Sequence, residues 1–327
     1  MTVFAPTQSD ARKTDLKASD AYLKMLFALQ RETRDFYRDH IPLARTVEAV
    51  ENLSASTSEA IIRIAEEYLD FEAIKPLIDF ETSRYRSFPL YYSPMTALNT
   101  GAVTGWVLIN HPKVLVMLIA FDPTEFRTQK NLGRMNETIN FSAGDISLRL
   151  LKSDGFTCSH WRAPLLTDEK SIDGDLHCVH DKTVTYKTGD RIYTKGGTET
   201  IVYEDVTSPT IGIQIYSRQF RTNVMVDYDH ETYLVKSLSA ADQRSSRMQM
   251  LNTVARLFER GDAIGPMQYL MQHPDHYVRW QTARELIALE PEAAKGPLRE
   301  MSQKDPNPDI RKMATRTLEM FYAESPA

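Results

Sequence analysis

Cysteine is scarce in this sequence. The chain of 327 residues contains two, Cys158 and Cys178. Two cysteines in a chain of this length do not make a disulfide framework, so we expect both thiols to be reduced and the protein to be cytoplasmic. Positive charge is not in excess either, because 39 Lys and Arg stand against 44 Asp and Glu, a net charge of −5. A dedicated nucleic-acid-binding protein would carry a basic face, and we predict no nucleic-acid partner.

Long apolar runs are also missing. The longest, Val114–Phe121, has eight residues, whereas a transmembrane helix needs about 20. The first 20 residues are polar and lack the apolar core of a signal peptide, so we expect neither a leader nor a membrane span. Also absent are the glycine-rich phosphate loop, the dinucleotide fingerprint and the serine-hydrolase elbow. With 42% hydrophobic residues, the chain can form two or three globular domains.

Residues 1–90 show helical periodicity. Apolar side chains recur at roughly helical spacing in Leu16–His40. A second helix is expected after Ser56, because Ser56 and Glu59 have the spacing of a capping box. Pro76 is expected to kink or end this second helix, since proline lacks the N–H group that a helix interior requires. These patterns predict an N-terminal helical region.

The pattern changes to short strands within residues 91–237. Val114–Phe121 is typical of a buried strand, and several β-rich runs follow it between turn signals. These runs are Ile146–Leu151, Leu176–His180, Thr183–Tyr186, Glu199–Tyr203, Ile211–Tyr216 and Val224–Tyr228. Short strands at this spacing indicate an antiparallel sandwich or barrel.

Helical periodicity returns over residues 238–327, together with an internal repeat. Ala263–Gln272 aligns with Ala294–Gln303, and Val278-Arg279 aligns with Ile310-Arg311, at an offset of about 31 to 32 residues. Each unit has a first helix opened by proline and a second helix that carries the apolar–arginine pair.

The repeated unit resembles the HEAT-repeat family over about residues 245–322. Ala314 fits the small residue that is usual at its place, whereas Thr282 departs from it. The resemblance implies an interaction surface for a protein partner. Two or three units are few for a free solenoid, which is stabilised by stacking neighbours. We therefore expect the helical segment to pack against the β region or the N-terminal helices.

A second resemblance, to the cupin superfamily, covers residues 145–235. Gly189–Thr200 is similar to the second cupin motif, a glycine turn that leads into a strand, and His160 stands near the first motif. Metal-binding cupins have a histidine near the place of Thr200, which this sequence lacks. The resemblance implies a β-roll that binds a small molecule or a divalent metal, and a homodimer formed through the rolls. The predicted fold is therefore α+β: N-terminal helices, a cupin-like β-roll and C-terminal HEAT-like repeats.

Two triplets of the same type use both cysteines, Cys158-Ser-His160 and Cys178-Val-His180. Residues i and i+2 of a strand face the same side, so each triplet would present a sulfur and an imidazole together. If the two strands are neighbours, the four side chains could hold zinc or iron, with His177 as an alternative to His180. The other interpretation is that both cysteines are small buried core residues, as free cysteines usually are.

Trp161 and Arg162 follow His160 directly. An arginine beside a tryptophan at the mouth of a barrel could hold an anionic ligand, because guanidinium pairs with carboxylate in a bidentate manner. The simpler interpretation is cation–π packing at a strand end. His160, Trp161 and Arg162 are thus the candidate ligand-binding residues.

Two functions remain open on this basis. One is a small-molecule-binding cupin-like protein with a helical-repeat interaction surface. The other is a metal-dependent enzyme of the cupin type, such as an oxygenase or isomerase of a small polar substrate, with zinc or iron as its cofactor. A purely structural or assembly role is the third alternative, and the sequence does not decide whether the protein is an enzyme.

Overall fold

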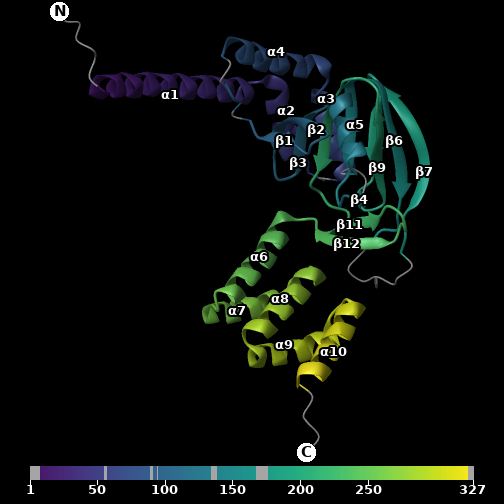
Figure 1. Cartoon of the computed structure of the whole chain (residues 1–327). Helices are drawn as coiled ribbons and strands as arrows, with labels where there is room; N and C mark the ends of the chain where they lie inside the picture. The colour runs from purple at the N-terminus through teal and green to yellow at the C-terminus, as the bar shows by residue number, and fades with distance from the viewer. Residues whose placement is uncertain are drawn as a thin grey trace, which may run out of the picture.

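The computed structural model describes residues 8–54, 57–88, 91–93, 95–133, 138–166 and 176–322. N-terminal helices, a central region of antiparallel sheets and C-terminal helices follow one another along the chain, which confirms the predicted α+β class (Figure 1). None of the helices described is long and apolar enough to span a membrane.

The N-terminal part contains α1 (Gln8–Arg38), α2 (Ile41–Glu51), α3 (Ser58–Tyr68) and α4 (Phe71–Ser87). Ser56 lies outside the described residues, and the side chain that caps α3 is Thr57, whose Oγ1 accepts from the Ala60 N–H at 3.2 Å. The expectation that Pro76 ends the second helix is wrong, because that helix, α3, ends earlier and Pro76 lies inside α4. The chain breaks earlier, at Asp70, whose extended backbone and capping carboxylate begin a new helix.

Twelve described strands form three antiparallel sheets. The six-stranded sheet has the order β1 (Ala97–Asn99), β2 (Val103–Asn110), β3 (Val114–Phe121), β10 (Thr210–Ser217), β5 (Ile146–Lys152) and β8 (Arg191–Thr194). The second sheet is β12 (Val235–Ala240), β11 (Val224–Asp229) and β4 (Thr138–Phe141), and the third is β7 (Val179–Lys187), β6 (Asp154–Arg162) and β9 (Glu199–Val206). The short helix α5 (Pro123–Asn131) follows β3.

The expected strands are confirmed except near residue 180. Thr183–Tyr186 is not a separate strand, because it belongs to β7 with Val179 and His180. Leu176–Cys178 precedes β7, and His177 forms only an isolated bridge to Leu234.

Strand alternation gives the six-stranded sheet two different apolar faces. One face, with Val116 and Ile213, packs on the N-terminal helices through residues such as Ile61. The other face, with Ile119 and Leu148, packs inside the roll on side chains of the β7-β6-β9 sheet. Because both faces are buried, the central strand β3 reads as a continuous aliphatic run.

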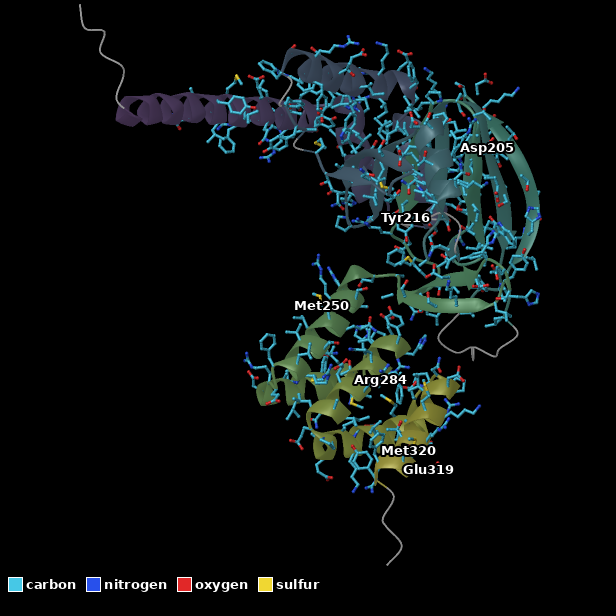
Figure 2. The ribbon with its side chains drawn as sticks, in the orientation of Figure 1. Asp205, Tyr216, Met250, Arg284, Glu319 and Met320 are labelled. Atoms are coloured by element: carbon cyan, nitrogen blue, oxygen red, sulfur yellow. The ribbon has the colours of Figure 1, made fainter. Side chains whose placement is uncertain are left out.

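The C-terminal helices are α6 (Gln243–Leu257), α7 (Ile264–Leu270), α8 (His276–Leu289), α9 (Pro291–Lys304) and α10 (Pro308–Tyr322), with a 3₁₀ turn at Gly261–Ala263. Figure 2 labels Met250 on α6, Arg284 on α8 and Met320 on α10. Thr282, the departure from the usual alanine, is fully buried, and its Oγ1 accepts from Asn252 Nδ2 at 2.7 Å. The hydroxyl therefore has a partner in α6 that alanine could not bind.

The helical segment contacts the β region, as expected. The Tyr277 hydroxyl donates to the Asn223 carbonyl at 3.0 Å, and Asn223 Nδ2 donates to Asp275 Oδ1 at 3.0 Å. The Tyr277 ring also packs against the apolar cluster around β4 and β11. A polar junction with one aromatic anchor thus joins the two parts.

One buried ion pair joins successive helical units. Arg279 donates two hydrogen bonds to the carboxylate of Asp305, at 2.7 Å each, and two more to the His273 and Pro274 carbonyls. Both charged side chains are almost fully buried. Arg279 belongs to the apolar–arginine pair predicted in each repeat. It therefore binds both the turn before its own helix, α8, and the turn of the next unit, which contains Asp305.

We expect Arg279→Ala to destabilise the helical segment by about 3 to 5 kcal/mol, because it leaves the buried Asp305 carboxylate without its partner. The measurement is hydrogen exchange of the α8 and α9 amides. Lys304→Ala, which removes an exposed pair with Glu300, is the control and should change exchange little. Equal protection in both variants would contradict this role of Arg279.

Candidate functional site

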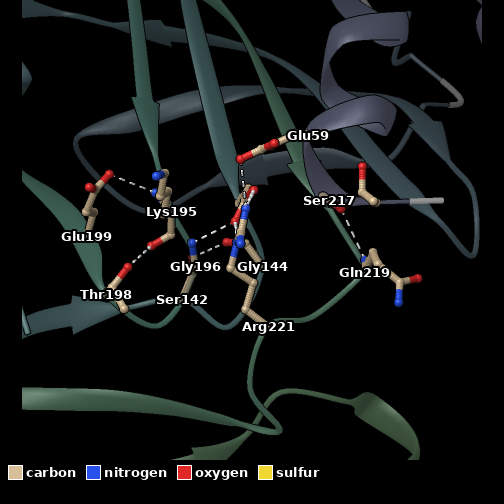
Figure 3. Close-up of polar contacts among 12 residues, drawn as sticks. Glu59, Ser142, Gly144, Lys195, Gly196, Thr198, Glu199, Ser217, Gln219 and Arg221 are labelled. Carbon is tan, nitrogen blue, oxygen red and sulfur yellow. Dashed lines mark hydrogen bonds and ion pairs between the residues drawn. The ribbon is translucent and has the colours of Figure 1, made fainter. Parts of the chain in front are cut away.

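The buried carboxylate of Asp145 binds two residues labelled in Figure 3, Gly196 and Arg221, at one end of the roll. Arg221 binds both of its oxygens, with Nε 2.5 Å from Oδ1 and Nη2 2.8 Å from Oδ2. The Tyr193 hydroxyl donates to Oδ2 at 2.5 Å, and the Gly196 N–H donates to Oδ1 at 2.8 Å. A Cβ at Gly196 would lie 2.4 Å from the Ala143 carbonyl oxygen, so this close approach requires glycine.

The protonation state of this carboxylate follows from its partners. Burial raises the pKa of Asp145, but the hydrogen bonds from Arg221, Tyr193 and Gly196 outweigh it and leave the pKa below its ordinary value. The same hydrogen bonds raise the pKa of the Arg221 guanidinium. Arg221 Nη2 also lies 3.3 Å from Glu59 Oε1 on α3, so the network reaches the helical layer.

A cavity of about 230 Å³ lies inside the roll next to this network. Its lining comes from β4, β5, β8, β9 and β10 and consists of uncharged side chains. They are Thr138, Asn140, Ile146, Leu148, Ile192, Thr194, Thr200, Ile201, Val202, Tyr203 and Gln214.

Several polar groups of the lining are available to a ligand. The side chains of Thr194 and Gln214 make no hydrogen bond to another described residue, although only 5% of Thr194 is exposed. Thr200 donates to the Asn140 carbonyl at 2.7 Å and keeps its oxygen lone pairs. Asn140 Nδ2 is already bound to Asp227 at 2.7 Å. The cavity therefore offers a ligand uncharged hydrogen-bonding groups, namely the amide of Gln214 and the hydroxyl groups of Thr194 and Thr200.

His160 is not among the residues that line the cavity, although its cross-strand partner on β9, Ile201, does line it. Its Nε2 is 2.6 Å from the Tyr186 hydroxyl, so the ring has a protein partner. Burial, and then the ammonium group of Lys182, hold the pKa of His160 below its ordinary value.

The two cysteines are buried in different apolar clusters. Cys158 packs inside the roll with Phe156, whereas Cys178 packs with Trp161 in the cluster around β4 and β11. Burial raises the pKa of the Cys158 thiol far above its ordinary value and that of Cys178 to about 11. Both side chains therefore have the environment of core thiols rather than of thiolates.

The remaining candidates lie outside the cavity. His180 is exposed and its Nε2 is 3.0 Å from Thr183 Oγ1. The Trp161 ring is buried and donates to Ser159 Oγ at 3.0 Å. Arg162 pairs with Asp181 at 3.3 Å instead of stacking on Trp161.

Arg162 and His177 nevertheless line the same surface pocket, which has a volume of about 260 Å³. The other residues of its lining are Ala163, Pro164, Leu176 and Val179. By contrast, the described residues contain no group of three His, Cys, Asp or Glu side chains that could hold a metal ion. Cys158, His160, Cys178 and His180 are thus not brought together.

The cavity residues are the functional candidates that the sequence patterns did not reveal. A signal was present in the strand Thr210–Ser217, where Gln214 is an amide between two isoleucines. Thr194 gives a weaker signal at the end of β8. An uncharged polar side chain in an otherwise apolar buried strand indicates a hydrogen-bonding site.

A comparison with protein families agrees with the predicted resemblance to HEAT repeats. A family model described as HEAT repeats matches residues 232–325. A comparison with curated proteins found no match to the sequence.

Similar solved structures include cupin-type proteins. Hydroxypropylphosphonic acid epoxidase from S. wedmorenis and an RmlC-like cupin from Shewanella frigidimarina are each 11% identical over 38% of this chain, with a TM-score of 0.24. The match spans 55% of the epoxidase chain and 84% of the cupin. KdgF from Halomonas sp. is 8% identical over 37% of this chain and 86% of its own, with a TM-score of 0.23.

We expect Asp145→Ala to lower the free energy of unfolding by about 3 kcal/mol, because Arg221 and Tyr193 lose their shared partner. Since the folded pKa of Asp145 is lowered, its contribution is present above its ordinary pKa near 3.8 and is lost as the pH falls below it. Urea denaturation between pH 3 and pH 7 measures both effects.

Asp79→Ala is the matched control, since Asp79 forms an exposed pair with Lys75. It should leave stability at pH 7 nearly unchanged. An Asp145→Ala variant as stable as this control, or with the acid sensitivity of the unchanged protein, would show that the network does not stabilise the roll.

Proposed function

We propose that this protein binds a small, uncharged, polar molecule in the cavity of its β-roll and presents its helical repeats to a protein partner. The carrying observation is the cavity lined by Thr194 and Gln214, whose side chains are unpaired among the described residues. Their polar atoms are not fully buried, so water can reach them, and a ligand that replaces this water would form hydrogen bonds with them in its place.

The size and charge of the cavity support this class of ligand. Its volume of about 230 Å³ is that of roughly eight water molecules, which suits a short polyol or a single small ring. The lining carries no charged side chain, and a charged ligand would lose its hydration without gaining a partner ion. Aliphatic side chains such as Leu148 and Ile192 provide surface for the carbon atoms of the ligand.

The alternative function, a metal-dependent enzyme, requires Cys158, His160, Cys178 and His180 to converge, or His177 to replace His180. These side chains belong to different clusters and faces. We therefore favour binding over chemistry at a zinc or iron centre. Binding of an anionic ligand stays a prediction for the surface pocket lined by Arg162 and His177, called here the Arg162 pocket. Arg162 is the one candidate ligand-binding residue with a guanidinium group, and it lines this pocket.

The experiment is isothermal titration of the full chain with a panel of neutral polyols and monosaccharides and their carboxylated analogues. We expect a neutral compound to bind. Gln214→Leu and Thr194→Val should each weaken its binding up to about tenfold, because each removes one hydrogen bond without a large change of shape. Arg162→Ala should leave the affinity for the neutral compound unchanged.

Two results would count against the proposal. One is binding only of the carboxylated compounds with loss in Arg162→Ala, which would move the site to the Arg162 pocket. The other is neutral binding that persists in the Gln214→Leu/Thr194→Val double variant. Far-UV circular dichroism and thermal unfolding of each variant check that the fold is retained.

A further inference from the structure

Glu81, in the middle of α4, is a buried acidic residue of the N-terminal helices. Its exposed fraction is 0%. Its Oε1 accepts hydrogen bonds from the Ser93 hydroxyl at 3.0 Å and from the Tyr91 hydroxyl at 3.4 Å. Its Oε2 is buried as well and has no hydrogen-bond partner among the described residues. An ionised carboxyl group in such a place has lost its hydration without full replacement, which is unfavourable.

The charged and titratable groups around Glu81 do not compensate for this burial. Arg84 lies one turn further along α4, but its Nη2 pairs with Glu32 of α1 at 2.6 Å, and Glu81 forms no ion pair with a described residue. The phenols of Tyr37 on α1 and of Tyr91 also face the carboxyl group. Burial therefore raises the pKa of Glu81 above its ordinary value, and hydrogen bonds from hydroxyl groups only partly offset this effect.

Three segments of the chain meet at this carboxyl group: α1, α4 and the segment around Tyr91, which lies between α4 and β1 in the chain. The Tyr91 hydroxyl lies 2.9 Å from the Thr33 hydroxyl of α1, and its ring packs edge-on against Tyr85 of α4 with 5.2 Å between centroids. Phe36 of α1 stacks on Phe80 of α4, with 4.0 Å between ring centroids. Figure 1 shows α1 projecting from the rest of the molecule, so these contacts hold its C-terminal part.

We propose that Glu81 is a pH-sensitive switch: its protonated carboxyl group keeps α1 and residues 91–93 packed on α4, and its ionisation loosens this contact. The neutral group can stay without water, whereas the carboxylate must regain hydration, and this requires the junction to open. The inference goes beyond the proposed function and involves neither the cavity of the roll nor the helical repeats.

The direction of the pH dependence follows from the raised folded pKa. The contribution of Glu81 to stability is fully present below its ordinary pKa near 4.5 and is lost as the pH rises through the folded pKa. The contribution of Asp145 is instead lost as the pH falls, because its folded pKa is lowered. A measurement that is local to the α1 junction therefore separates the two groups.

Hydrogen exchange of the full chain between pH 5 and pH 9, corrected for the intrinsic exchange rate at each pH, tests the proposal. In the unchanged protein, the protection of the amides of residues 29–38 and 91–93 should fall several-fold as the pH rises. Glu81→Gln should keep its protection at every pH, because the amide has nearly the same shape and does not ionise. Glu32→Gln is the matched control: it removes an exposed carboxylate from the same junction and should retain the pH-dependent loss.

Ser93→Ala separates titration from a purely structural role. The Ser93 hydroxyl lowers the pKa of Glu81, so its removal should move the loss of protection to higher pH. An infrared band of a protonated carboxyl group, present below the transition and absent in Glu81→Gln, should assign the proton to Glu81. Three results overturn the proposal: constant protection in the unchanged protein, the same pH-dependent loss in Glu81→Gln, or a Ser93→Ala variant whose protection falls equally at every pH.

Discussion

The carboxylate of Asp145 holds together segments of the β region that are far apart in the sequence. Asp145 directly precedes β5, and the four hydrogen bonds to its carboxylate come from β8, the turn before β9 and the loop between β10 and β11. A buried charge is stable only if it is fully paired, so these segments must adopt one relative arrangement. Two of the strands that line the cavity, β5 and β8, are thereby joined at this end of the β region.

Much of the fold follows from local patterns in the sequence. Val114–Phe121 coincides with β3 because both faces of that strand are buried, which makes the apolar run continuous. The repeat offset located the helical segment, since Arg279 and its turn are required by the packing between units. The break between α3 and α4 lies at Asp70, which caps α4, and not at Pro76 as the sequence pattern suggested. Pro76 lies inside α4, where the helix tolerates the loss of one hydrogen bond.

The metal hypothesis for the two Cys-x-His triplets depended on an assumption about register that the sequence does not contain. Along β6 the alternation is as expected, with Cys158 and His160 on one face. A β-bulge opposite His160 and Trp161 then makes His180 the partner of Trp161 instead of Arg162. One extra residue moves the following side chains to the other face.

The cavity residues come from five strands, and their convergence is a property of the closed roll that no local pattern records.

The loop between β10 and β11 connects two parts of the molecule that are otherwise distinct. Within three residues, Arg221 binds Asp145, Thr222 donates to the Leu166 carbonyl at 2.7 Å, and Asn223 binds Asp275 in the helical segment. Such a short stretch of backbone has little freedom to let one end move while the other stays. A rotation of the helical segment about this junction would therefore also displace Arg221 and, through it, the Asp145 network next to the cavity.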